Sequence, residues 1–141
     1  MMKPDALWLK PDAIFDGGHI KKGYFLKIDN ARVNQILPEQ EMSAAASIVE
    51  LPCIVSPGFV DLQVNGGGGV LLNEKPSAEA MLEILGVHRS FGTVAIMPTV
   101  ISDAPEIMVK AVDAAIEVKD TVGLLGLHIE GPHIAVERRG A

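Results

Sequence analysis

Three strand-like segments separated by two helical segments constrain the fold of this chain more than any other feature. Thr93–Ile101 is a nearly continuous apolar run of strand length, which is typical of a buried parallel strand. Gly58–Val64 before it and Val122–Ile129 after it are also strand-like. Strands that alternate with helices in this order predict a parallel sheet with helical crossovers.

The two intervening segments carry the signals of amphipathic helices. Ser77 is the expected N-cap of a helix that runs through Phe91, and Gly92 is its expected C-terminal glycine. Ser102 or Asp103 is expected to cap the second helix, whose apolar stripe is as follows: Ile107, Met108, Ala111, Val112, Ala115 and Ile116.

Short strands with alternating polarity, broken by turn signals, fill the first fifty residues. Asp16-Gly17-Gly18 and Asp29-Asn30 are typical turn sequences. We therefore expect a β-meander with one face in water. The sequence predicts a small β-domain over residues 1–53 and an α/β domain over residues 54–141.

Composition excludes several classes of protein. The chain has 141 residues, is 48% hydrophobic and carries a net charge of −6, which is unsuited to binding nucleic acid. Its single cysteine, Cys53, permits no internal disulfide and no cysteine-type zinc site, and it suits a reducing compartment. Pro52, Pro57 and Asp61 interrupt the longest apolar region, so no membrane span is expected. We expect a soluble, cytoplasmic protein.

Polar side chains follow the first predicted strand at its carboxyl end, where α/β proteins place their functional groups. Alternation would send Asp61, Gln63 and Asn65 to one side, near the mouth of a barrel. A structural alternative is that these side chains pair with nearby backbone, and local sequence slightly favours it.

A second polar group stands at the end of the last predicted strand. Alternation places His128 and Glu130 on the same side, where an imidazole and a carboxylate could converge on a metal ion. A buried glutamate is costly unless it is paired or metal-bound, so we interpret Glu130 as a metal ligand. His128 is equally compatible with a ligand, a supporting residue or a core histidine. His133 follows a proline and is expected at the surface.

The glycine run Gly66–Gly69 has three interpretations. It could form a backbone nest for an anion, allow close approach of the backbone to a ligand, or meet a conformational need. It lacks the lysine and hydroxyl residue of a Walker loop.

Two longer motifs together resemble a known family. Residues 57–66, PGFVDLQVNG, resemble the first barrel strand of amidohydrolases, with Gln63 and Asn65 where two metal-binding histidines usually stand. Residues 126–132, GLHIEGP, resemble a motif of the N-acetylglucosamine-6-phosphate deacetylases. The replaced histidines and the glycine-rich loop are similar to the single-metal type of that family.

The resemblance implies a fold and an activity. It implies the first two to three βα units of a truncated (β/α)8 barrel of the TIM type, beside a small β-sandwich built from both chain ends. The implied reaction is hydrolysis of the acetamide of N-acetylglucosamine 6-phosphate, with this N-terminal piece inactive alone. The partner is thus a small phosphorylated amino sugar, and a homo-oligomer, dimeric in the family, is expected.

The resemblance also implies roles for particular residues. Glu130 would bind one divalent metal ion, zinc or iron. Gln63, Asn65 and Ala141 would contact substrate, the last through its backbone. The two remaining ligands would be histidines and the general acid/base an aspartate, all downstream, so no catalytic residue is expected within this chain.

Two other functions stay open at this point. The chain could belong to another amidohydrolase, although the absence of two histidines at residues 63 and 65 disfavours that. It could instead be a free-standing α/β module that binds phosphate through Gly66–Gly69. If only part of a barrel is present and folds alone, we expect it to associate through its unpaired sheet edge or to rearrange from the geometry of the whole barrel.

Overall fold

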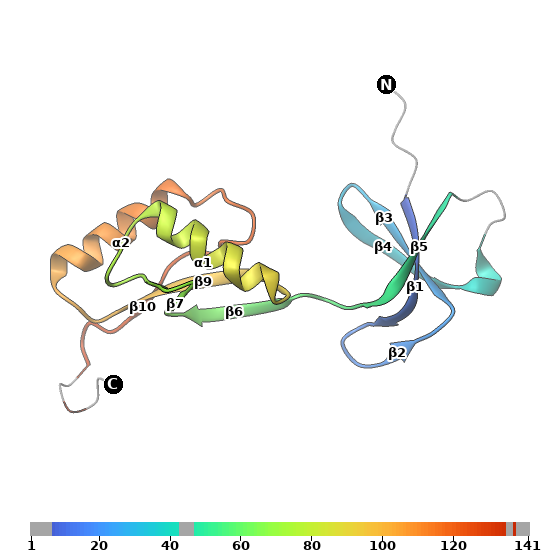
Figure 1. The fold of residues 1–141 in the computed structure, drawn as a ribbon, viewed down its shortest axis with the longest axis horizontal. Coiled ribbons are helices and arrows are strands. Elements are labelled where there is room, and N and C mark those ends of the chain that lie inside the picture. Colours follow the sequence, from blue (N-terminus) through green and yellow to red (C-terminus); the bar gives the residue numbers. More distant parts are fainter. Residues whose placement is uncertain (1–6, 43–46, 135–136, 138–141) are drawn as a thin grey trace, which may run out of the picture. The chain divides into compact units, whose positions relative to one another are not determined.

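The computed structural model describes residues 7–42, 47–134 and 137, and the chain divides into two compact units, Met1–Pro57 and Gly58–Ala141. Figure 1 shows a β unit and an α/β unit in that order. The predicted boundary, between residues 53 and 54, lies within strand β5 (Ile48–Val55). Because β5 pairs with strand β1 (Leu7–Phe15) as far as Val55, these residues stay with the first unit.

A single five-stranded sheet forms the described part of the first unit. Its other strands are β2 (Ile20–Lys21), β3 (Tyr24–Asp29) and β4 (Arg32–Pro38), and a short 3-10 turn, Glu39–Glu41, follows β4. β2 and β3 pair antiparallel with β1, and β4 pairs antiparallel with β3, as a meander requires. β5 departs from the predicted meander because it pairs parallel to β1. The described residues of this unit supply one layer rather than both layers of the expected β-sandwich.

The turn after β1 is held by the side chain of Asp16. Its Oδ1 accepts the backbone N–H groups of Gly18 at 3.0 Å and His19 at 2.8 Å, and Oδ2 lies 2.8 Å from Lys21 Nζ. The Lys21 ammonium and then the two amides hold the pKa of the Asp16 carboxyl well below its usual range. The predicted turn at Asp16-Gly17-Gly18 is therefore confirmed, with a side-chain mechanism.

Three parallel strands and two helices make up the second unit. They are β6 (Phe59–Val64), α1 (Ala78–Ser90), β9 (Thr93–Ile101), α2 (Pro105–Glu117) and β10 (His128–Glu130). The strand order is β10-β9-β6 and both pairings are parallel, as the alternation of strands and helices predicts. The short hairpin of β7 (Gly66–Gly67) and β8 (Val70–Leu71) lies between β6 and α1. None of the helices in the described ranges is long and apolar enough to span a membrane.

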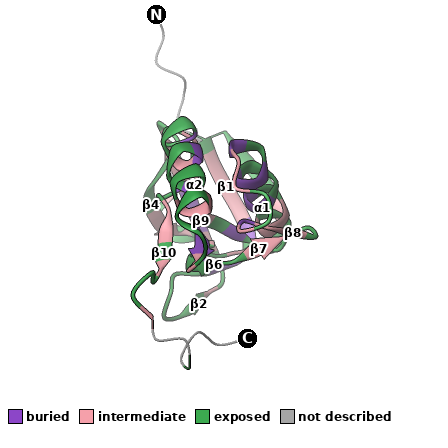
Figure 2. Cartoon of the chain, turned by 90° about the vertical axis from the view of Figure 1, so that its left-hand side faces the viewer, coloured by how far each residue is buried: buried purple, intermediate pink, exposed green. Residues whose placement is uncertain are grey.

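The core of this unit lies between the sheet and both helices, which cover the same face (Figures 1 and 2). Strand and helix residues share one buried cluster: Val64, Leu72, Ala78, Met81, Ile84, Leu85, Ile96, Val100, Ala111, Ala114, Val118 and Leu124. Ile96, Val100 and Ile84 are fully buried. Burying one such side chain stabilises the fold by roughly 1.5–3 kcal/mol.

The predicted start of α1 is confirmed and its end differs by one residue, because Phe91 is the C-cap and Gly92, with a φ of 93°, follows it, whereas the start of α2 differs. Ser77 Oγ accepts the backbone N–H of Ala80 at 3.2 Å, as an N-cap does. α2 instead begins after Ala104, without a side-chain cap. The side chains of Ser102 and Asp103, the predicted caps, are engaged elsewhere.

The strand predicted over Val122–Ile129 is correct only at its end. β10 covers His128–Glu130, and before it Leu124 makes an isolated bridge with Ile96. Gly123 and Gly126 have φ values of 91° and 142°, which interrupt an extended chain. The apolar run is thus partly loop, although Leu124 still contributes to the core.

Asn73 fastens the carboxyl end of β9 to the loop after β8. Its Nδ2 donates to the carbonyl of Ile101 at 2.8 Å, and its Oδ1 accepts the Ile101 N–H at 2.9 Å. This pair of bonds imitates a neighbouring strand. Nδ2 also donates to Asp103 Oδ2 at 2.9 Å, so one amide organises both Ile101 and the start of the next loop.

We predict that Asn73→Ala destabilises the second unit by about 1–3 kcal/mol, because it leaves part-buried backbone groups without partners. Urea unfolding measures the loss, and hydrogen exchange should accelerate at the amide of Ile101 in particular. Asn34→Ala, at an exposed position of β4, is the matched control. Unchanged protection at Ile101 would contradict the role given to Asn73.

Asp103 provides a prediction about pH. The hydrogen bond from Asn73, followed by the Ala104 N–H, lowers the pKa of its carboxyl below the ordinary 3.8. A depressed folded-state pKa means that the stabilisation is present above pH 3.8 and is lost as pH falls through the folded value. An NMR titration should give a midpoint below 3.8, which moves back toward 3.8 in Asn73→Ala. Equal midpoints in both proteins would refute the assignment.

Candidate active site

The carboxyl ends of β6, β9 and β10 bring four predicted or neighbouring polar side chains to one edge of the sheet. Gln63 comes from β6, Thr99 from β9, and His128 and Glu130 from β10. His128 lies beside Thr99 in the register and Glu130 lies beside Ile101. This is the edge at which α/β proteins bind ligands.

Glu130 and Gln63 meet across the central strand. Gln63 Nε2 donates a hydrogen bond of 3.0 Å to Glu130 Oε2, although β9 separates their two strands. Glu130 is half-buried, and the ion pairs found among the described residues involve other carboxylates. The glutamate that we interpreted as a metal ligand therefore accepts a hydrogen bond from a neutral amide, and none of the ion pairs found among the described residues involves it.

The backbone of Glu130 is held as well. Ser102 Oγ donates to its carbonyl at 2.7 Å, which links the loop after β9 to the end of β10. The next residue, Gly131, has a φ of 103°, and a Cβ there would collide with Ser102 Oγ. Only glycine meets both conditions without strain, so this glycine serves the approach of Ser102.

His128 contacts Thr99 on the neighbouring strand. Its Nδ1 lies 3.2 Å from Thr99 Oγ1, and that hydroxyl is also 3.4 Å from the carbonyl of Met97. Both contacts are satisfied together in the tautomer with a proton on Nδ1, because the hydroxyl then accepts from His128 and donates to Met97. Thr99 is completely buried and His128 is half-buried, so the supporting role left open for His128 gains a definite partner.

The three polar residues expected to alternate along β6 behave differently from one another. Asp61 Oδ1 accepts the backbone N–H of Gln63 at 3.1 Å, and the ladder with β9 shifts register between Asp61 and Val64. Strict alternation therefore fails here, and the backbone-pairing alternative is correct for Asp61. Asn65 is exposed just past β6, and its carbonyl accepts the N–H of Leu72 at 3.3 Å. No hydrogen bond among the described residues joins Asn65 to Glu130.

The backbone conformation of the β7–β8 hairpin accounts for the glycines of Gly66–Gly69. Gly68 and Gly69 have φ values of 65° and 81° at the tip of the β7–β8 hairpin, as a two-residue hairpin turn of this kind requires. A Cβ on Gly66 would collide with the carbonyl of Val70. His88 on α1 contacts the same hairpin, with Nε2 3.0 Å from the carbonyl of Gly66. His88 lies within the helix predicted after Ser77, and its position in that helix carries no sequence signal for this contact.

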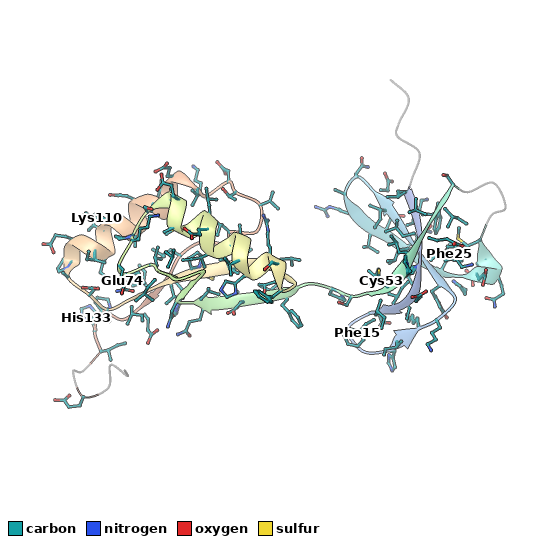
Figure 3. All side chains as sticks on the ribbon, viewed as in Figure 1. Phe15, Phe25, Cys53, Glu74, Lys110 and His133 are labelled. Atoms are coloured by element: carbon teal, nitrogen blue, oxygen red, sulfur yellow. The ribbon has the colours of Figure 1, made fainter. Side chains whose placement is uncertain are left out.

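The described residues do not form a metal site by themselves. Within them, no three His, Cys, Asp or Glu side chains are grouped closely enough to hold a metal ion. His133 is exposed on the loop that follows β10, as predicted (Figure 3). Ala141, a predicted substrate contact, lies outside the described residues.

Known proteins resemble both the sequence and the fold. No family model matches the chain. It is 48% identical over 85 residues to an N-acetylgalactosamine-6-phosphate deacetylase from Shewanella sp. (strain ANA-3), which covers 59% of the chain and 22% of that protein. It is 29% identical over 124 residues to the Haemophilus influenzae N-acetylglucosamine-6-phosphate deacetylase, covering 86% of the chain and 32% of the relative.

A solved structure agrees with these relatives. The N-acetylglucosamine-6-phosphate deacetylase from Pasteurella multocida matches 94% of this chain and 36% of its own, with a TM-score of 0.77 and 29% identity. The chain matches part of a sugar-phosphate deacetylase. It spans about a fifth to a third of the length of the curated relatives. The resemblance predicted from residues 57–66 and 126–132 is thus confirmed, and neighbours of the amidohydrolase fold support the α/β class.

Proposed function

We propose that this chain forms part of a metal-dependent deacetylase that hydrolyses the acetamide of an N-acetylhexosamine 6-phosphate to the free amine and acetate. The contact between Gln63 and Glu130 carries the proposal, because it brings an ionisable carboxylate to the shared end of three parallel strands. The named deacetylases that the chain resembles support the choice of reaction and substrate.

The chemistry of Glu130 suits one ligand of a divalent metal. A half-buried carboxylate held by an amide, with no cation beside it among the described residues, offers an oxygen to zinc or iron. Catalytic zinc takes about three protein ligands, so the others must come from outside the described residues. When bound, the metal would polarise the acetamide carbonyl and lower the pKa of an attacking water.

The remaining residues of the chain bind and orient in this proposal. Glu130 holds the metal, Gln63 and Asn65 line the substrate pocket beside it, and the backbone of Ala141 contacts the sugar. The proton for the departing amine comes from an acid outside this chain, since amide cleavage needs a general acid.

The proposal extends to the architecture and setting of the enzyme. β6, β9 and β10 are the first three strands of a (β/α)8 barrel, and the β1–β5 sheet is one layer of the accompanying sandwich. Cys53 is a free, exposed thiol, which suits the reducing cytoplasm. Assembly as a homodimer remains a prediction.

We predict that Glu130→Gln abolishes metal binding and deacetylation while preserving the fold, because it removes the charge but keeps the shape. The test uses a protein that contains these 141 residues and has the length of the curated relatives. Acetate release and metal content by mass spectrometry measure the loss, which we expect to exceed about 100-fold. Glu106→Gln, at an exposed position in the first turn of α2, should change neither. Full activity in Glu130→Gln would overturn the proposal.

The identity of the hexosamine is a separate question. The relative that is 48% identical is named for N-acetylgalactosamine 6-phosphate, whereas the Haemophilus influenzae relative is named for the glucose epimer. We expect kcat/KM to favour the galacto substrate by about tenfold, as one well-placed hydrogen bond to the epimeric hydroxyl provides. Steady-state assays with both sugar phosphates, and with the unphosphorylated sugars as controls, measure the ratio. A ratio in favour of the gluco substrate would reassign the sugar but keep the reaction.

A further inference from the structure

We propose that Asn65 is a site of spontaneous deamidation and that the contact of His88 with the Gly66 carbonyl restrains the reaction. Asn65 is exposed between β6 and β7, and it forms the only Asn-Gly pair in the sequence with Gly66. Asparagine is a labile residue, and its lability is greatest before glycine because no Cβ hinders the next amide nitrogen. The inference concerns the covalent structure of residue 65 and does not depend on the proposed function.

The reaction is an attack by the Gly66 amide nitrogen on the side-chain carbonyl carbon of Asn65. A bond forms between this nitrogen and Cγ of Asn65, and the bond between Cγ and Nδ2 breaks. Ammonia leaves with the proton that the Gly66 nitrogen gives up, and a cyclic succinimide remains. Water then opens the ring at either carbonyl to give aspartate or isoaspartate, so water is the only co-reactant.

The attacking nitrogen lies outside the hydrogen bonds of the β7–β8 hairpin. Gly67 pairs with Val70 next to the two-residue turn, and this pair carries the bonds that close the turn. Antiparallel pairs alternate between bonded and non-bonded, so the following pair, which contains Gly66, makes no ladder bonds. The bond from the Leu72 N–H to the Asn65 carbonyl, at 3.3 Å, agrees with this alternation. The ladder therefore does not hold the N–H of Gly66.

The side chain of Asn65 is free to react, in contrast to that of Asn73. No hydrogen bond to the amide of Asn65 is found within the described ranges, whereas the amide of Asn73 bonds to Ile101 and Asp103. Asn34 on β4 is exposed like Asn65, but a glutamine follows it. Exposure, an unengaged amide and a following glycine thus coincide at Asn65, and Asn34 provides a comparison within the same molecule.

Packing on α1 holds the segment that must move. Ring closure requires the backbone to rotate at Asn65, and this rotation displaces Gly66. His88 Nε2 lies 3.0 Å from the Gly66 carbonyl, and it donates in this contact because a carbonyl only accepts. A Cβ on Gly67 would lie 3.1 Å from the same nitrogen, so the hairpin packs directly on the imidazole ring. The contact with His88 therefore opposes the rotation and slows deamidation.

The product changes the chain at the point where β6 ends. Aspartate adds a negative charge at residue 65. Isoaspartate also routes the main chain through the former side chain, which adds a methylene between β6 and β7. The bond from Leu72 to the residue 65 carbonyl then no longer fits the register of the hairpin. Hydrogen exchange at the Leu72 amide should accelerate as isoaspartate accumulates.

The test follows the modification in the full-length protein that contains this chain. The protein is incubated in water enriched in heavy oxygen and digested in ordinary water, so only deamidation during the incubation labels a residue. Peptide mapping by mass spectrometry then locates the label. We expect residue 65 to be labelled about tenfold faster than residue 34, which corresponds to a barrier lower by about 1.4 kcal/mol. The rate should rise in more alkaline buffer, because the attacking nitrogen must lose its proton.

Variants of His88 test the restraint. We expect His88→Ala to accelerate labelling of residue 65 by about 2–10-fold, the rate equivalent of one hydrogen bond. His88→Phe keeps an aromatic ring but has no donor, so it should share the acceleration, and it carries the test if His88→Ala fails to fold. His19→Ala, at an exposed position after β1, is the matched control and should leave the rate unchanged.

The outcomes judge the site and the restraint separately. If residue 65 is labelled no faster than residue 34 in the unaltered protein and in both His88 variants, Asn65 is not a deamidation site and the inference is wrong. Fast labelling of residue 65 that neither His88 variant increases would overturn the restraint assigned to His88. Acceleration in both His88 variants, and none in His19→Ala, supports the inference.

Discussion

The pairing of β9 with a parallel strand on each side is the constraint on which the second unit depends. Ile96 and Val100 on this central strand are fully buried against the helix layer, and Thr99 is buried beside His128. Because β6 and β10 are both registered to β9, their polar side chains reach the same edge of the sheet. The contact between Gln63 and Glu130 is therefore a consequence of strand pairing, with no loop needed to bring the two together.

Where the strands end, side chains form the hydrogen bonds that a neighbouring strand would otherwise form with the backbone. Asn73 completes the hydrogen bonding of Ile101, and Ser102 serves the carbonyl of Glu130. This use of polar residues explains why α2 begins without a side-chain cap. Asn73 and Ser102 are thus polar residues at this edge whose side chains bond to the backbone. Once the backbone-bonded residues are set aside, the side-chain pairs Gln63–Glu130 and Thr99–His128 remain at this edge.

Periodicity predicted the elements of the second unit well because each lies in a simple environment. Thr93–Ile101 is buried or half-buried at every position except Val94, and the helix capped by Ser77 buries one apolar face. The errors arose where the local pattern competes with contacts distant in sequence. The parallel return of β5 onto β1 depends on tertiary pairing, and the register shift near Asp61 depends on a side chain bonding to its own strand. Glycines with positive φ shortened β10, and an apolar run alone does not reveal them.

For the site residues too, the sequence predicted the strand positions but not the contacts between residues distant in sequence. The sequence placed Gln63 and Glu130 at the carboxyl ends of two parallel strands, but it could not indicate that their side chains would bond directly across β9. That bond bears on how the proposed enzyme is assembled. Val60 and Leu62 on β6 are each 57% exposed, and Ile129 on β10 is 41% exposed, so both outer strands present apolar surface of the kind that further strands of a barrel would bury. If Glu130 binds a metal as proposed, a carboxylate that is already oriented within three strands would need little reorganisation when the other ligands close around the ion, which would lower the entropy lost on binding.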